Sequence, residues 1–206
     1  MKNIIKMTVC AMLIVATLFC SVGCDDVYNG SAQLSSDATH VVTFEIANYG
    51  KVEIELYGNL APITVDNFVK LVKDGKYDGS YFHRIVDGFV AQGGDIDGSV
   101  DGYSTGNFSQ IKGEFTENGV NNPTKHVKGT ISMARSSLPN SASTQFFIVL
   151  ETNSNNTQAL DGKYAAFGKV VSGMGLVELF SSGWNSNLLP ASYRPKITKA
   201  TVQTVK

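Results

Sequence analysis

Short segments in which apolar and polar residues alternate constrain the fold of this chain more than any other feature. Residues 42–46 and 52–56 alternate in this way, and Asn48-Tyr49-Gly50 lies between them. Because successive side chains of a strand point to opposite faces, two such runs joined by turn-forming residues predict a β-hairpin. Six further apolar segments, bounded by Gly, Asn or Ser, follow at 81–86, 89–91, 129–133, 145–150, 165–171 and 196–205. The sequence therefore predicts a mostly β fold with a closed antiparallel sheet, since closure removes exposed edges.

Two segments have the spacing of helices instead. Pro62 suits a first helical turn, Gly75 suits a helix end, and apolar residues between them recur at positions i, i+3, i+4 and i+7. Residues 174–180 form a second run that predicts a helix. A chain of 206 residues, 43% of them hydrophobic, is long enough to bury one core, and no internal repeat marks a second domain.

The first 24 residues have the features of an export signal. Lys2 and Lys6 precede an apolar run at 7–19, which is shorter than the roughly 20 residues that a membrane-spanning helix needs. Ser21-Val22-Gly23-Cys24 follows, and the whole segment resembles a bacterial lipoprotein signal. That resemblance implies cleavage before Cys24 and lipidation of this cysteine, so that the lipid anchors the chain to a membrane. The alternative is an ordinary cleaved signal and a soluble secreted protein.

Composition limits the partners of the exported chain. The 17 basic and 18 acidic residues give a net charge of -1, so the positive field that nucleic acid binding requires is absent, and we predict no nucleic acid partner. Residues 25–39 are polar and lack periodicity, which predicts a flexible tether, and the folded domain is expected to span 40–206. We expect a monomer outside the cytoplasm, at the outer face of the cytoplasmic membrane or in the periplasm or cell envelope.

Four motifs carry a resemblance to a known family. Residues 77–95 read YDGSYFHRIVDGFVAQGGD, and three further blocks follow in order: GTISMA at 129–134, TQFFI at 144–148 and LDGKYAAFG at 160–168. In content, order and spacing they resemble the signature blocks of the cyclophilins, a family of peptidyl-prolyl cis/trans isomerases. The resemblance extends from about residue 40 to the C-terminus. It implies a closed antiparallel eight-stranded β-barrel with two helices, and an enzyme without cofactor or metal.

The resemblance also implies the site residues, residue by residue. Arg84, Phe89 and Gln92 would be the catalytic residues, with Arg84 and Gln92 reaching the Xaa-Pro bond. Seven other residues would bind substrate. Those around the proline ring would be Val90, Phe147, Leu160 and Tyr164. Gln145 and the backbone around Ala134 and Arg135 would hold the residues before the proline. The implied partners are unfolded or exported polypeptides that contain proline. We interpret His83, beside Arg84, as a structural group.

The chemistry of this reaction explains why one arginine has the central catalytic role. Rotation about the peptide bond breaks amide resonance against a barrier of roughly 18 to 20 kcal/mol, and no covalent bond is made or broken. As the bond twists, the proline nitrogen regains a lone pair that can accept a hydrogen bond. The guanidinium of Arg84 offers five donors, always carries its charge, and so stabilises the twisted state selectively. No nucleophile, metal or titrating group is required, and we predict a nearly flat pH profile of activity.

Three other interpretations compete with this one. Gly102-Tyr103-Ser104-Thr105-Gly106 fits the G-x-S-x-G pattern of serine hydrolases, but neither an apolar strand before it nor a helix after it is evident. Asp97, Ser99 and Asp101 resemble half of a calcium loop, but Phe108 stands where such a loop ends in Glu, so a turn is the better interpretation. The serious rival is a proline-peptide binding module or chaperone that has the groove but little turnover.

Overall fold

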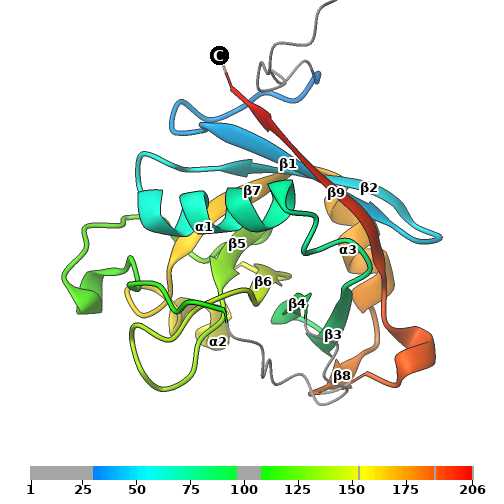
Figure 1. Ribbon diagram of the computed structural model, residues 1–206. Coiled ribbons are helices and arrows are strands. Elements are labelled where there is room, and N and C mark those ends of the chain that lie inside the picture. The colour runs from blue at the N-terminus through cyan, green and yellow to red at the C-terminus, as the bar shows by residue number, and fades with distance from the viewer. Residues whose placement is uncertain (1–29, 97–107, 153, 188, 206) are drawn as a thin grey trace, which may run out of the picture.

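The chain folds into a mostly β domain built on one curled sheet, with two main helices packed against it (Figure 1). The computed structural model describes residues 30–96, 108–152, 154–187 and 189–205. The strands are β1 (His40–Ile46), β2 (Gly50–Leu56), β3 (Tyr81–Val86), β4 (Val90–Asp95), β5 (Thr130–Met133), β6 (Phe146–Val149), β7 (Ala166–Ser172), β8 (Asn185–Ser186) and β9 (Ile197–Thr204). The helices are α1 (Pro62–Lys73), the four-residue α2 (Asn155–Gln158) and α3 (Met174–Ser181), with 3₁₀ turns at Thr116–Asn118 and Ala191–Tyr193.

The sheet is an open half-barrel, so the prediction of a closed eight-stranded barrel is wrong. Its strand order is β8-β3-β4-β6-β5-β7-β2-β1-β9, and every neighbouring pair is antiparallel. Within the described residues, the end strands β8 and β9 form no ladder with each other. An isolated bridge between Tyr81 and Lys196 connects the start of β3 with the residue before β9. The two-residue β8, which the sequence did not predict, occupies the edge of β3 at Ile85 and Val86.

The predicted first hairpin is confirmed, and its register explains the alternation in the sequence. Phe44 lies opposite Val52 on the buried face, whereas Glu45 lies opposite Lys51 on the exposed face, where their side chains form an ion pair of 3.0 Å. Asn48 in the turn has a φ of 66°, in the left-handed region that asparagine tolerates better than most residues. The hairpin thus presents one apolar face to the core.

The predicted first helix is also confirmed as α1, but its N-terminus is capped by a distant residue. Pro62 occupies the first turn, and no side chain at the preceding Ala61 caps the helix. Instead the buried carboxylate of Glu114 accepts hydrogen bonds from the backbone N–H groups of Ile63 (3.1 Å) and Thr64 (2.7 Å). A carboxylate at this end satisfies free donors and interacts favourably with the helix dipole. Glu114 therefore attaches α1 to a segment 50 residues away in the chain.

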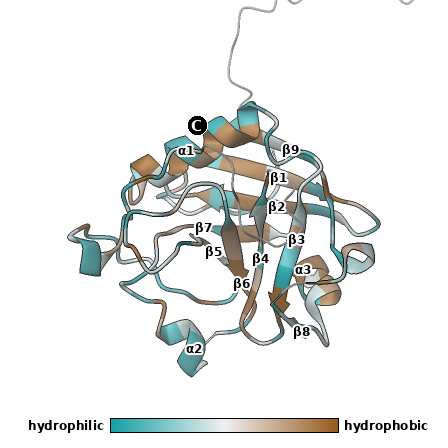
Figure 2. Cartoon of the chain, turned by 60° about the horizontal axis from the view of Figure 1, so that its bottom comes forward, coloured by the Kyte–Doolittle hydropathy of each residue, from teal (hydrophilic) through white to brown (hydrophobic). Residues whose placement is uncertain are grey.

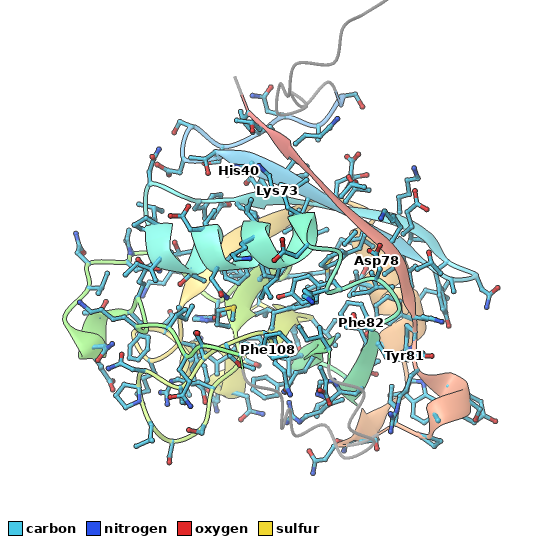
Figure 3. The ribbon with its side chains drawn as sticks, viewed as in Figure 1. His40, Lys73, Asp78, Tyr81, Phe82 and Phe108 are labelled. Atoms are coloured by element: carbon cyan, nitrogen blue, oxygen red, sulfur yellow. The ribbon has the colours of Figure 1, made fainter. Side chains whose placement is uncertain are left out.

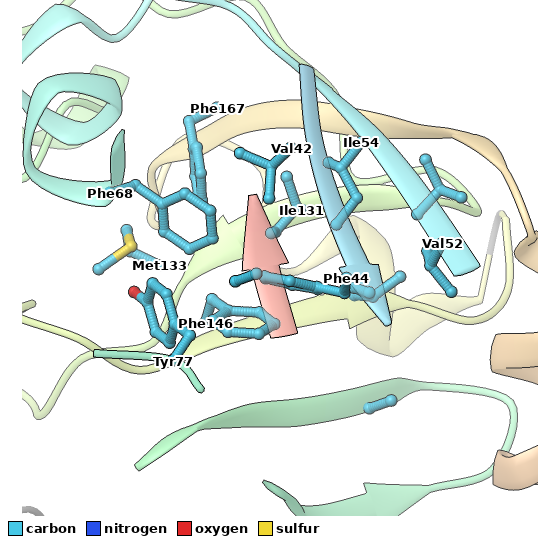
Figure 4. Close-up of a cluster of buried hydrophobic side chains, with 14 of the residues drawn as sticks. Val42, Phe44, Val52, Ile54, Phe68, Tyr77, Ile131, Met133, Phe146 and Phe167 are labelled. Atoms are coloured by element: carbon cyan, nitrogen blue, oxygen red, sulfur yellow. The ribbon is translucent and has the colours of Figure 1, made fainter. Parts of the chain in front are cut away.

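Aromatic rings from α1 and the sheet form the centre of the core. Phe44, Phe68, Phe146 and Phe167 are completely buried and in contact, with ring centroids 5.0 to 6.3 Å apart in the pairs that join them (Figure 4). Tyr77 joins the same cluster, and its hydroxyl donates a 2.8 Å hydrogen bond to a backbone carbonyl. In Figure 2 the hydrophobic residues of α1 and the strands contrast with the hydrophilic α2, which lies outside this core.

Asp78 attaches the last strand to the turn before β3 (Figure 3). Its carboxylate accepts from the Nζ of Lys199 at 2.7 Å and from the backbone N–H of Ala200 at 2.8 Å. Desolvation acts to raise the pKa of Asp78, but the two hydrogen bonds and the charge of Lys199 together lower it. The turn that leads into the strand of Arg84 is therefore fixed against β9.

Several predictions concern residues outside those that the structure describes. These predictions are the signal segment at 1–24 with Cys24, the G-x-S-x-G pattern, and the calcium-loop pattern up to residue 107. At the end of the predicted tether, the backbone N–H of Ser35 donates to Glu55 at 2.7 Å and that of Thr39 donates to Leu56 at 2.9 Å. In the part of the chain that the structure describes, no helix has both the length and the hydropathy for a membrane span.

Candidate active site

A second hydrophobic cluster lies apart from the main core, on the other face of β4 and β6. Strand alternation produces it, because Phe146 and Ile148 of β6 point into the core while Phe147 and Val149 point to the opposite face. On β4, Val90 lies opposite Val149, and Gln92 lies opposite Phe147. Leu160 completes the buried part of this cluster. Phe89, Ala134 and Tyr164 pack around it.

This cluster forms the floor of a pocket of about 240 Å³ that brings together nearly all the predicted site residues. The lining residues that the structure describes come from β3, β4, the turn between them, β6 and the loops after β5 and α2: Arg84, Phe89, Val90, Gln92, Ala134, Arg135, Phe147, Leu160 and Tyr164. Gln145, the remaining predicted residue, does not line the pocket. Its Oε1 accepts a 2.9 Å hydrogen bond from Nε2 of Gln92 and so orients that amide from behind.

A β-bulge turns Arg84 toward the pocket. Phe82 pairs with Gly93 and Arg84 pairs with Gln92, so the register shifts at His83. As a result Phe82 and His83 are both buried, and Arg84 projects to the face of Gln92. His83 is 4% exposed, and its Nδ1 has no hydrogen-bond partner among the described residues. This burial is consistent with the interpretation of His83 as a structural residue.

Two side chains hold the guanidinium of Arg84 from different sides. Its Nε donates to Oδ1 of Asn187 at 3.2 Å, and its Nη1 lies 3.5 Å from Oε1 of Gln92, at the limit of a hydrogen bond. Burial lowers the pKa of Arg84 from its ordinary value, which is high enough that the group keeps its charge near neutral pH. Asn187 follows β8 directly, and no pattern in the sequence indicated that it would reach the site.

Close packing of β4 against the loop before β6 explains the paired glycines after Gln92. Gly94 has a φ of 80°, and a Cβ at this position would lie 2.7 Å from the carbonyl oxygen of Thr144. A residue with a side chain would push the strands apart and move the amide pair of Gln92 and Gln145.

A buried polar chain supports the pocket from behind. The ring of His126 stacks on Phe147 at 6.0 Å, with 22° between the planes. Its Nδ1 lies 3.0 Å from the carboxylate of Asp161, and its Nε2 lies 3.0 Å from Oγ of Ser132. Because a carboxylate accepts, Nδ1 carries the proton and Nε2 accepts from the serine. Burial lowers the pKa of His126 even though Asp161 favours its charged form.

The order Ser132–His126–Asp161 has the connectivity of a hydrolase triad, but it cannot act as one. Ser132 is 0% exposed and its hydroxyl bonds to the buried ring of His126, so no substrate reaches it. Sequence reasoning missed this chain because its members lie up to 35 residues apart. Among the described residues, no group of three or more His, Cys, Asp or Glu side chains is placed to hold a metal ion.

These features define a small pocket with an apolar floor and two arginines, Arg84 and Arg135, in its lining. Comparison with known proteins gives the family. Residues 41–202 match the family model of the cyclophilin type peptidyl-prolyl cis-trans isomerase/CLD. The chain belongs to this family.

Individual relatives agree with the family model. A peptidyl-prolyl cis-trans isomerase of Acinetobacter baylyi is 43% identical over 132 residues, which are 64% of this chain and 66% of that protein. A probable peptidyl-prolyl cis-trans isomerase of Brucella suis is 36% identical over 185 residues, 84% of this chain and 89% of that protein. A crystal structure of a cyclophilin type isomerase from Cryptosporidium parvum, determined in the presence of the dipeptide Ala-Pro, superposes with a TM-score of 0.65 at 26% identity and covers 79% of this chain and 98% of the other.

Proposed function

We propose that this chain catalyses cis/trans rotation of Xaa-Pro bonds in exported polypeptides and so assists their folding outside the cytoplasm. The observation that carries the proposal is the position of Arg84, half-buried and held by Asn187 and Gln92 at the edge of the apolar pocket. The relative crystallised in the presence of Ala-Pro supports a proline peptide as the ligand.

The proposed mechanism follows from the pocket. Phe89, Phe147 and Leu160 surround the proline ring and exclude water, while Gln92 holds the backbone next to it. When the imide bond twists, the proline nitrogen becomes an acceptor, and a free N–H of Arg84 donates to it. This donor stabilises the twisted state more than the planar one, which is the requirement for catalysis. Low water content around the donor strengthens the interaction.

The test is an exchange assay on a short Xaa-Pro peptide, with the wild type beside Arg84→Ala. Loss of one preorganised donor typically costs about 3 to 4 kcal/mol, so we expect kcat/KM to fall by about 100- to 1000-fold. Peptide affinity should change much less, because the apolar pocket remains. Lys169→Ala removes one exposed positive charge from the outer face of β7 and serves as the matched control. Full turnover in Arg84→Ala would exclude the mechanism, and absence of turnover in the wild type would leave a binding module.

We further propose that the protein is exported and held at a membrane by lipid on Cys24. Lys2, Lys6 and the apolar run before the cysteine support this, as in a lipoprotein signal. The wild type should partition into the detergent phase of cell extracts, and Cys24→Ala should move to the aqueous phase. Equal partition of the two would exclude the anchor.

A further inference from the structure

Arg135 is the second cation at the pocket, and its guanidinium is held in place by the fold. The guanidinium carbon lies 4.5 Å from the centre of the Tyr164 ring and 5.2 Å from that of Phe115. Nε and Nη2 both donate to the carbonyl oxygen of Lys163, at 3.0 and 2.8 Å. Nη1 donates to the carbonyl of Ser136 at 2.9 Å. A planar group held by stacking and by a forked hydrogen bond loses little further freedom when it meets a ligand.

The charge of Arg135 has no carboxylate partner among the described residues. Within the described part of the chain its hydrogen bonds all go to backbone carbonyl oxygens, including a longer one of 3.4 Å to Ser137. A guanidinium has five N–H groups, and these bonds use four of them. One N–H and the full positive charge of Arg135 are therefore available at the rim of the pocket.

The rest of the pocket does not compensate this charge. Of the residues known to line it, Arg84 and Arg135 are the charged ones, and no Asp or Glu is present among them. The pocket thus combines an apolar floor with two fixed cations, whereas the whole chain has a net charge of -1. Such a local excess of one sign attracts ligands of the opposite sign.

We propose that Arg135 is a specificity-determining residue, which makes the pocket select proline peptides with a carboxylate side chain within a few residues of the proline. The inference rests on the proposed function, since it names the class of substrate for the same pocket. Arg84 is directed to the proline nitrogen, so Arg135 is the cation that is free to pair with a side chain of the substrate. A pair at this partly exposed rim has the strength of a surface ion pair, enough for a modest preference.

The experiment compares pairs of peptides that are identical except that one carries Glu where the other carries Gln, a side chain of nearly the same shape. The varied position is one, two or three residues before the proline, or directly after it. Both kcat/KM and Kd are measured for each peptide. In 50 mM salt we expect the Glu peptide to be favoured about two- to fivefold in at least one position, and the ratio should approach one at 1 M salt because screening shortens to about 3 Å. A wild-type ratio of one or less in every position would overturn the proposal.

Variants assign the preference to a residue. Arg135→Gln should reduce the Glu/Gln ratio at least twofold, whereas Arg135→Lys, which keeps the charge, should retain part of it. Lys163→Gln is the matched control, since it removes an exposed positive charge from the residue whose carbonyl Arg135 contacts, outside the pocket lining. An unchanged ratio in Arg135→Gln, or an equal reduction in Lys163→Gln, contradicts the assignment. If Arg135→Gln does not fold, the Arg135→Lys variant and the salt dependence decide.

The two measurements separate this inference from the proposed function. A preference for Glu in Kd without any acceleration of exchange would contradict isomerase activity and keep the charge selectivity. Acceleration of exchange for Glu and Gln peptides alike would keep the isomerase activity and contradict the selectivity.

Discussion

Mild acid, between pH 7 and pH 5, should destabilise this fold, because His83 is buried in its neutral form. The side chain is 4% exposed, and its pKa is lowered from 6.5 to about 4. Burial is the main cause, the positive charges of Arg194 and Arg84 add to it, and a hydrogen bond with the backbone of Tyr81 opposes it. The unfolded chain therefore takes up a proton at a higher pH than the folded one, and stability falls as pH falls from about 6.5 toward 4.

The size of the effect follows from the pKa of His83. One unit of difference corresponds to about 1.36 kcal/mol, and between pH 7 and pH 5 linkage gives a loss of about 2 kcal/mol from this residue alone. His126 adds to the loss with the same sign, because burial lowers its pKa too. The pKa values of Asp74, Asp78 and Asp161 are lowered from 3.8, so the stability they contribute is lost only at still lower pH. Between pH 7 and pH 5 the two histidines therefore act before these three aspartates.

Urea unfolding at several pH values across this interval measures the effect. His83→Phe keeps a ring of similar size without a titrating group. Whatever the absolute stability of this variant, its loss of unfolding free energy between pH 7 and pH 5 should be about 2 kcal/mol smaller than that of the wild type. Arg194→Gln removes one of the charges that depress the pKa and should shrink the loss by a smaller amount. If His83→Phe loses as much stability as the wild type, the histidine does not control acid sensitivity and the reasoning is wrong.

Three further outcomes are expected. Glu114→Ala should lower the free energy of unfolding by about 2 to 4 kcal/mol in urea titrations, because two N–H groups at the start of α1 lose a charged acceptor; a loss below 1 kcal/mol would show that water replaces it. Asn187→Ala should reduce kcat/KM by about two- to tenfold in the exchange assay while Kd stays within twofold, since it frees Arg84 without opening the apolar pocket. Activity of the wild type should vary little between pH 6 and pH 9, and a bell-shaped profile in the exchange assay would indicate a titrating catalytic group.

Local patterns in the sequence predicted those features that local physics determines. The alternation at 42–46 and 52–56 was sufficient for the β1–β2 hairpin, and the spacing after Pro62 was sufficient for α1. Alternation also explains why adjacent phenylalanines have different surroundings, since Phe146 lies in the core and Phe147 in the pocket. The position of Phe147 in the site was nevertheless implied by family resemblance, because alternation alone does not say which face of a strand binds a ligand.

Contacts between distant segments were beyond this reasoning. The capping of α1 by Glu114 and the contact of His126 with Asp161 span 50 and 35 residues, and neither has a signature in the sequence. They depend on how the loops between strands fold back on the sheet. The same holds for Asn187, whose side chain reaches the site only because β8 pairs with β3.

The wrong prediction of closure and the unpredicted position of Asn187 have one physical origin. Closure was expected because sheet edges are prone to unwanted pairing, but very short strands, prolines and lysines protect edges as well. Here β8 has two residues, and Pro195 and Lys196 precede β9. In a closed barrel β9 would follow the edge of β3 along its whole length. Instead β8 pairs with the end of β3, and its register continues to place Asn187 opposite Arg84. The pairing of β8 with β3 therefore provides the hydrogen bond from Arg84 to Asn187 at the edge of the pocket.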